Sequence, residues 1–140
     1  MTVRLIVALA AIVALPGAAT AQADMLTTLA TRADVAIRAS GYRATRWQHR
    51  GQLRQRGAET VRVKLDGTQP VRIVGMCDGG CDDLNLDLID AAGKSIDKDT
   101  GSDGFPIVAA DEGGSYSVRV TMPGCDDATC GYLIRAYVKR

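Results

Sequence analysis

The four cysteines are the residues whose type and spacing most clearly indicate chemistry. They lie in two short acidic loops, Cys77-Asp-Gly-Gly-Cys81 and Cys125-Asp-Asp-Ala-Thr-Cys130, each flanked by strand-like sequence. Such pairs are typical of disulfides formed in an oxidising compartment. We expect Cys77 to pair with Cys81 and Cys125 with Cys130, each bond closing a hairpin, because the flanks of an antiparallel hairpin come within disulfide reach.

Two alternatives to this pairing remain open. Four cysteines permit three pairings in all, so a cross-link between the two loops is one alternative. Zinc binding is the other. Against zinc, the spacings lack a paired Cys-x-x-Cys pattern, and an exported protein is a poor setting for a thiolate site.

Aspartates gather around the same loops. If successive strands alternate in direction, three loops share one end of the domain, and calcium there would find the oxygen ligands it requires. The predicted calcium ligands are Asp82, Asp83, Asp97, Asp99 and Asp103. The segment that starts at Asp97 resembles the beginning of an EF-hand loop, but its twelfth position is Val108 instead of Glu. Aspartate is also a common turn residue, so solvated loops without any cofactor are the alternative.

Catalytic residues are not apparent. His49 is the single histidine, and no serine stands in a nucleophile-elbow setting. We therefore expect no catalytic residue and no enzyme. A small hydrolase is the alternative, and it would need His49 beside a carboxylate and a nucleophile.

Charge is distributed unevenly along the chain. Basic side chains dominate residues 32–64 and acidic side chains dominate residues 77–127. Arg46, Trp47, Arg50 and Arg54 form a candidate interaction segment, because protein interfaces favour Trp and Arg. The alternatives are solvated charged faces and a Trp47 that pins this segment to the domain. The expected partner is an envelope protein or a polymeric ligand, and export argues against nucleic acid.

The first 23 residues predict export. Arg4 is followed by a short apolar run, and Ala21-Gln-Ala23 matches a cleavage site, so we expect a signal peptide over residues 1–23 that is cut before Asp24. The apolar run is shorter than the roughly 20 residues that cross a bilayer, and no later segment predicts a transmembrane span. The protein is therefore expected in the periplasm or outside the cell.

The remaining chain predicts a helix followed by a β-domain. Apolar residues recur at steps of three and four between Met25 and Ile37, which indicates an amphipathic helix over residues 24–41. Between residues 42 and 140 the apolar period becomes two, with Gly, Pro and Asp clusters between the alternating stretches. This pattern predicts an all-β fold, an antiparallel jelly-roll-like β-sandwich.

One run carries a family resemblance. The segment from Cys77 to Asp90, followed by Gly93, Asp103, Pro106 and Gly114-Ser-Tyr-Ser-Val-Arg-Val120, resembles the bacterial pre-peptidase C-terminal domain. The resemblance covers roughly residues 59–139 and implies a non-catalytic jelly-roll-like module. Members of that family usually accompany secreted peptidases, and some bind calcium or polymers. Within these 140 residues we expect no attached peptidase, and the two cysteine pairs are not a general feature of the family.

These observations predict an exported, non-enzymatic binding or interaction module of the bacterial envelope. Its contacts are expected at the end of the domain that carries the acidic loops, or at the basic segment from Arg43 to Arg56. The alternatives are a small secreted hydrolase, a peptidase-associated, inhibitor-like domain, and a purely structural envelope protein.

Overall fold

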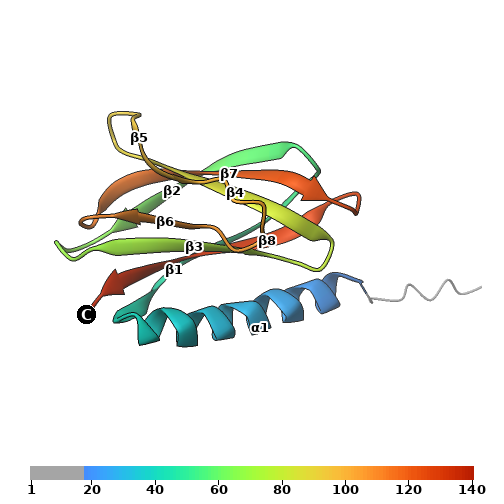
Figure 1. The fold of residues 1–140 in the computed structure, drawn as a ribbon, viewed down its shortest axis with the longest axis horizontal. Helices are drawn as coiled ribbons and strands as arrows, with labels where there is room; N and C mark the ends of the chain where they lie inside the picture. The colour runs from blue at the N-terminus through green and yellow to red at the C-terminus, as the bar shows by residue number, and fades with distance from the viewer. Residues whose placement is uncertain (1–17) are drawn as a thin grey trace, which may run out of the picture.

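Eight antiparallel strands form two four-stranded sheets in the computed structural model, which describes residues 18–140 (Figure 1). The first sheet, sheet A, has the order β1 (Tyr42–Leu53), β8 (Cys130–Lys139), β3 (Val71–Cys77) and β6 (Ile107–Ala110). Sheet B has the order β2 (Gly57–Leu65), β7 (Gly114–Cys125), β4 (Cys81–Ile89) and β5 (Ser95–Asp99). This is the strand order of a jelly roll, so the predicted fold class is confirmed.

Side-chain alternation explains why the two sheets pack face to face. Leu84, Leu86 and Leu88 of β4 are fully buried in the sandwich, and the residues between them lie on the outer face of sheet B. Strand β8 differs, because nearly all its residues are buried. Sheet A is therefore covered on both faces, by sheet B inside and by a helix outside.

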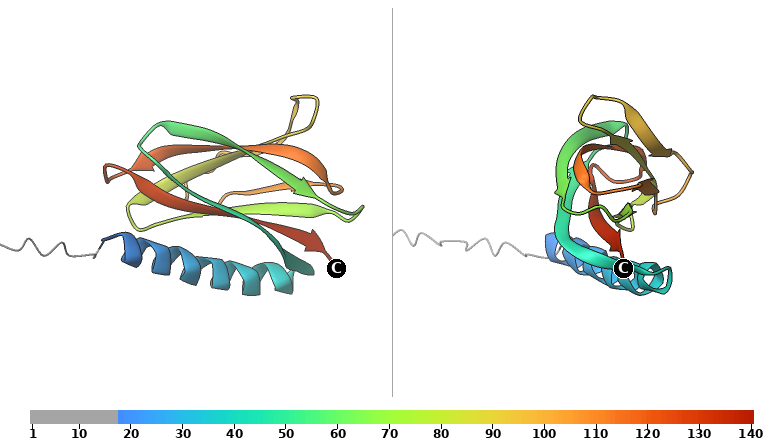
Figure 2. Two further views of the ribbon diagram at one scale, coloured as in Figure 1. Left: turned by 180° about the vertical axis from the view of Figure 1, so that it is seen from behind. Right: turned by 90° about the vertical axis from the view of Figure 1, so that its left-hand side faces the viewer.

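The covering element is helix α1 (Ala18–Ala39), which lies along the outer face of sheet A (Figure 2). Leu26, Ala30 and Ile37 form a second apolar cluster with Met76 and Leu133 of the sheet. The helix ends where Gly41 takes a φ of 85°, a left-handed conformation that glycine adopts without strain. No helix in the described range is long and apolar enough to cross a membrane.

A partly buried polar contact fixes the helix to the sheet. The Tyr137 hydroxyl donates to Asp34 Oδ1 at 2.8 Å, and Arg135 Nη1 donates to Asp34 Oδ2 at 3.0 Å. Burial and then the hydrogen bond to Asp34 raise the pKa of Tyr137 above its ordinary value. The helix is thus part of the domain rather than a loosely attached leader.

The helix bounds differ slightly from the prediction. The helix begins at Ala18, inside the segment predicted as a signal peptide, and ends at Ala39 instead of residue 41. Residues 1–17 of that predicted signal peptide lie outside the described residues.

Nearly every connection crosses from one sheet to the other. Among the described strands, only β4 and β5 are consecutive in the chain and neighbours in one sheet. Strands β3 and β4 lie in different sheets, and so do β7 and β8. The prediction that the cysteine loops close hairpins is therefore wrong, because the strands that flank each loop do not pair with each other.

Candidate functional site

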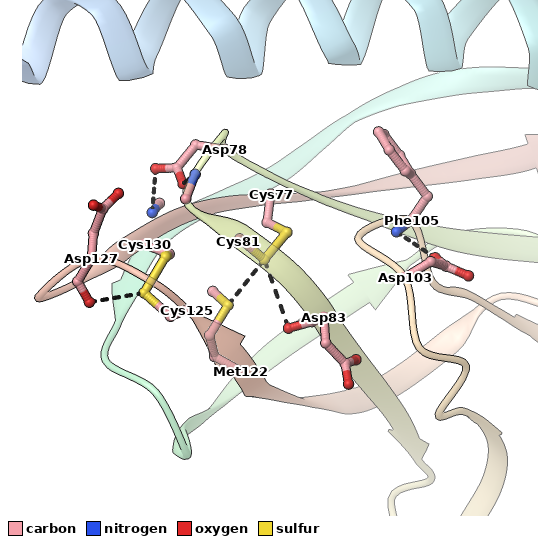
Figure 3. The surroundings of a disulfide bond; sticks show 12 residues. Cys77, Asp78, Cys81, Asp83, Asp103, Phe105, Met122, Cys125, Asp127 and Cys130 are labelled. Carbon is pink, nitrogen blue, oxygen red and sulfur yellow. Dashed lines mark hydrogen bonds between the residues drawn. A yellow bond between two sulfur atoms is a disulfide. The ribbon is translucent and has the colours of Figure 1, made fainter.

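Both cysteine pairs form the predicted local disulfides, Cys77–Cys81 and Cys125–Cys130, with Cα atoms 5.8 and 5.9 Å apart. Cys81 and Cys125 are register partners in sheet B, whereas Cys77 and Cys130 lie in sheet A. Two neighbouring cross-links therefore tie the sheets together at one end of the sandwich, here called the clamped end (Figure 3).

Asp78 joins the two loops of the clamped end. Its side chain is 3% exposed, and its Oδ2 accepts a hydrogen bond from the Gly131 amide at 2.6 Å. The Gly80 amide donates to Asp78 Oδ1 at 3.3 Å, and the Asp126 amide donates to the Gly80 carbonyl at 2.8 Å. A Cβ on Gly80 would lie 2.0 Å from Asp127 Oδ2, which shows how closely the two loops approach. These contacts give Asp78 a structural role.

Two of the predicted calcium ligands are engaged elsewhere. Asp97 Oδ2 accepts the Ala109 amide at 2.7 Å, and Asp99 Oδ2 accepts the Ile107 amide at 2.8 Å. Both amides belong to β6, the edge strand of sheet A, while both carboxylates belong to β5, the edge strand of sheet B. The two aspartates therefore close one side of the sandwich by capping an otherwise open strand edge.

The other three predicted ligands lie near one another. Burial and then the negative charges of Asp82 and Asp103 raise the pKa of Asp83 above its ordinary value. Asp103 Oδ1 accepts the Phe105 amide at 2.7 Å, a contact drawn in Figure 3. Within residues 18–140, no three His, Cys, Asp or Glu side chains are arranged to hold a metal ion. Calcium binding stays a prediction, which calorimetric titration of the protein with Ca²⁺ tests.

His49 does lie beside a carboxylate. Its Nε2 is 3.1 Å from Glu59 Oε1, and the buried Tyr132 hydroxyl donates a hydrogen bond to the same oxygen. The three side chains come from β1, β2 and β8, so the contact connects the two sheets at their β1–β2 side. A Cβ on Gly51 would lie 2.5 Å from Glu59 Oε1 and 2.7 Å from Tyr132 Cε1, so glycine makes room for this contact.

This trio lacks the third component of a hydrolase site. Within the described part of the chain, no serine, threonine or cysteine side chain hydrogen-bonds His49. The imidazole thus has a carboxylate that could orient it but no nucleophile to activate.

The four residues of the predicted interaction segment do not share one surface. Arg50 Nη2 donates to Thr27 Oγ1 of α1 at 3.1 Å, which places Arg50 on the helix side of sheet A. Arg54 lies in the turn between β1 and β2, eight residues or about 25 Å along the strand from Arg46. Only Arg46 and Trp47 line the same groove.

A β-bulge shapes β1 at that groove. Ala44 pairs with Tyr137 and Gln48 pairs with Arg135, so Thr45, Arg46 and Trp47 lie opposite one residue of β8. Thr45 holds the bulge, because its Oγ1 donates to the Ala136 carbonyl at 3.0 Å and accepts the Trp47 amide at 3.1 Å. Bulges redirect side chains and are common beside functional sites.

The groove, here called the basic groove, has a volume of about 480 Å³ and lies between the start of β1 and the end of β2. Its lining comprises Arg43, Thr45, Arg46, Trp47, Lys64, Leu65, Asp66 and Val138. The side chains of Arg43, Arg46 and Lys64 are exposed and make no ion pair with any described residue. Sequence reasoning missed Lys64, whose only signal is its position in a strand that ends near the start of β1.

Trp47 contributes to the apolar part of the basic groove together with Leu65 and Val138. It is half-buried and packs against the core between the sheets, which agrees with the alternative that Trp47 pins β1 to the sandwich. The same residue also lines the groove. The groove is reached from the end of the sandwich opposite the clamped end, because Val138 and Cys130 are at opposite ends of β8.

No family model matches the chain, and no curated protein matches it. Among solved structures, the chain is similar to the crystal structure of Aeromonas hydrophila PliG, a periplasmic lysozyme inhibitor of g-type lysozyme. The identity is 13%, the similarity covers 69% of this chain and 88% of that chain, and the TM-score is 0.45. A similarity of this size supports no conclusion about what this chain binds.

Proposed function

We propose that this chain is an exported, non-catalytic module that binds another protein through the basic groove. The observation that carries the proposal is the groove itself, which is lined by Arg43, Arg46 and Lys64 together with the half-buried Trp47. Trp and Arg are the residues that most often dominate the binding energy of protein interfaces.

The rigidity of the scaffold supports a binding role. Two disulfides and the Asp78 contacts hold one end of the sandwich, and the Thr45 contacts hold the bulge at the other. A surface that is ordered before binding loses less conformational entropy when the partner docks.

Two observations support the absence of catalysis and the export. Among the described residues, no serine, threonine or cysteine side chain joins the His49–Glu59–Tyr132 contact. The two disulfides are of the kind that persists in oxidising compartments. Mass spectrometry of material recovered from its native location tests export, with an N-terminus at Asp24 and no free thiol as the expected result.

The binding proposal is tested by affinity capture from an envelope extract. Three baits are compared. The first is residues 24–140, here called the mature protein. The second is a groove variant with Arg43, Arg46 and Lys64 changed to Ser, and the third is a control variant with Arg32, Arg54 and Arg119 changed to Ser. Both variants lose three positive charges from exposed positions, so they differ only in where the charge is removed. We expect one partner to be retained by the mature protein and the control and lost by the groove variant.

Equal retention by all three baits would contradict binding through the groove. A peptidase-associated, inhibitor-like role is an alternative and more specific form of this function. It is checked by adding the mature protein and the groove variant to assays of secreted peptidases and cell-wall hydrolases. Only the mature protein is expected to slow its target enzyme.

A further inference from the structure

The chemistry of the basic groove indicates what kind of partner segment it receives. We propose that the groove binds an acidic segment of the partner protein, with carboxylates on Arg43, Arg46 and Lys64 and an apolar or planar side chain against Trp47. This inference rests on the proposed protein-binding function and names the chemistry of the bound segment.

Charge complementarity is the first argument. Three cationic side chains and one acidic side chain, Asp66, line the groove, and none of the three cations is neutralised by an ion pair within the described residues. An acidic segment would supply the missing counter-charges. Guanidinium groups match carboxylates especially well, because they donate two parallel hydrogen bonds to the two oxygens.

The arrangement of the cations is the second argument. Arg43 lies just before the bulge in β1 and Arg46 lies within it, while Lys64 comes from β2 in the other sheet. The cations therefore stand on both walls of the groove, so a chain lying along it meets positive charge on either side. A segment with several carboxylates fits this arrangement better than a single small anion does.

Trp47 is the third argument. Its ring supplies apolar surface to a lining that also carries three cations, and its indole N–H donates no hydrogen bond within the described part of the chain. An indole offers both a flat apolar contact and one donor. A peptide with an apolar residue between acidic residues would use both.

Trp47 also provides the measurement, because it is the only tryptophan of the chain. Its fluorescence is followed while the mature protein is titrated with a synthetic peptide of the sequence Glu-Glu-Leu-Glu-Glu at low ionic strength. We expect saturable binding that shifts the emission, and a loss of affinity of about tenfold when salt is raised well above 0.1 M, since exposed charges are then screened. The matched peptide Lys-Lys-Leu-Lys-Lys is expected to leave the emission unchanged.

The variants locate the effect. The Arg43/Arg46/Lys64→Ser groove variant should weaken acidic-peptide binding at least tenfold, and the Arg32/Arg54/Arg119→Ser control should retain it. Circular dichroism checks that both variants are folded. A second readout compares quenching of Trp47 by iodide and by acrylamide. Loss of the cations from a folded groove variant should lower only the iodide quenching constant, whereas unfolding would change both constants.

Other outcomes would overturn the inference. Inorganic phosphate that shifts the emission as strongly as the peptide would show a general anion site. Groove-dependent sedimentation with anionic vesicles would show a lipid surface, and groove-dependent self-association in analytical ultracentrifugation would show a second copy as the occupant. If affinity capture finds a groove-dependent partner but the acidic peptide does not bind, the proposed function stands and only the chemistry of the segment is wrong.

Discussion

Tyr137 and Asp34 make a hydrogen bond of 2.8 Å between the centre of sheet A and helix α1. The two residues are far apart in the chain, and the Tyr137 side chain is fully buried. This contact, together with the Asp34–Arg135 ion pair, orients the helix on the sheet that carries the basic groove on its β1 edge.

Removal of the Tyr137 hydroxyl should destabilise the protein measurably. Tyr137→Phe leaves Asp34 Oδ1 without this donor, and a hydrogen bond to a charged group contributes about 1.5–3 kcal/mol. We expect the free energy of unfolding, measured by urea denaturation, to fall by that amount. Tyr42→Phe is the matched control: Tyr42 packs in the same apolar cluster, and its hydroxyl makes no hydrogen bond with described residues. An equal loss in both variants would contradict a specific role for the Asp34 contact.

The capping of β6 by Asp97 and Asp99 predicts a local effect on hydrogen exchange. In an Asp97/Asp99→Ala double variant, the amides of Ile107 and Ala109 lose their acceptors. Loss of a charge-assisted hydrogen bond should accelerate their exchange about tenfold or more. The Val108 residue provides an internal control, because it pairs with Ile73 of β3 on the other side of the strand. Unchanged exchange at Ile107 and Ala109 would show that these carboxylates do not cap the edge.

The raised pKa of Asp83 predicts that replacing this carboxylate by a neutral side chain stabilises the protein to an extent that depends on pH. The folded protein binds the Asp83 proton more tightly than the unfolded chain does. The contribution of this proton to the free energy of unfolding is therefore complete below pH 3.8, the ordinary pKa of the carboxyl, and is lost as the pH rises through the pKa in the folded protein. Asp83→Asn should therefore raise the melting temperature at pH 7 and change it less at pH 3. Asp126→Asn, at an exposed position of the same end, serves as the control. A gain of the same size at both pH values would contradict the assignment.

Gly51 should not tolerate a side chain. In Gly51→Ala the new Cβ would overlap Glu59 Oε1 and Tyr132 Cε1, and overpacking of this kind costs about 1–3 kcal/mol. We expect a corresponding fall in the free energy of unfolding. Gly79→Ala is a matched substitution whose Cβ has its nearest neighbour, Met25 Sδ, at 3.6 Å, and it should be nearly neutral. Equal stability of Gly51→Ala and Gly79→Ala would contradict the close packing described around the His49–Glu59–Tyr132 contact.

The strands and the disulfide pairing could be predicted from the sequence because both depend on local spacing. Leu84, Leu86 and Leu88 alternate with polar residues, and each cysteine lies within five residues of its partner. The sheet to which each strand belongs is not encoded in that alternation. The cross-sheet position of both disulfides therefore required the three-dimensional structure.

The candidate site was harder to predict, because its residues act through partners distant in the chain. The residue type of Asp97 and Asp99 predicts calcium ligands, but their carboxylates accept hydrogen bonds from backbone amides of a strand in the other sheet. The sequence groups Arg50 and Arg54 with Arg46, but Arg50 donates a hydrogen bond to Thr27 of α1 and Arg54 lies in the turn between β1 and β2. Lys64 joins the groove only because β2 ends beside the start of β1. Membership of the pre-peptidase C-terminal family stays a prediction.

Site-specific photo-crosslinking in the native cell shows whether a protein docks in the basic groove. A photoreactive phenylalanine analogue is placed at position 46 in the basic groove or, as a control, at position 119 on the exposed face of sheet B. We expect a discrete adduct with one protein from position 46 and none from position 119. No adduct from position 46, or the same adduct from both positions, would contradict protein binding through the groove.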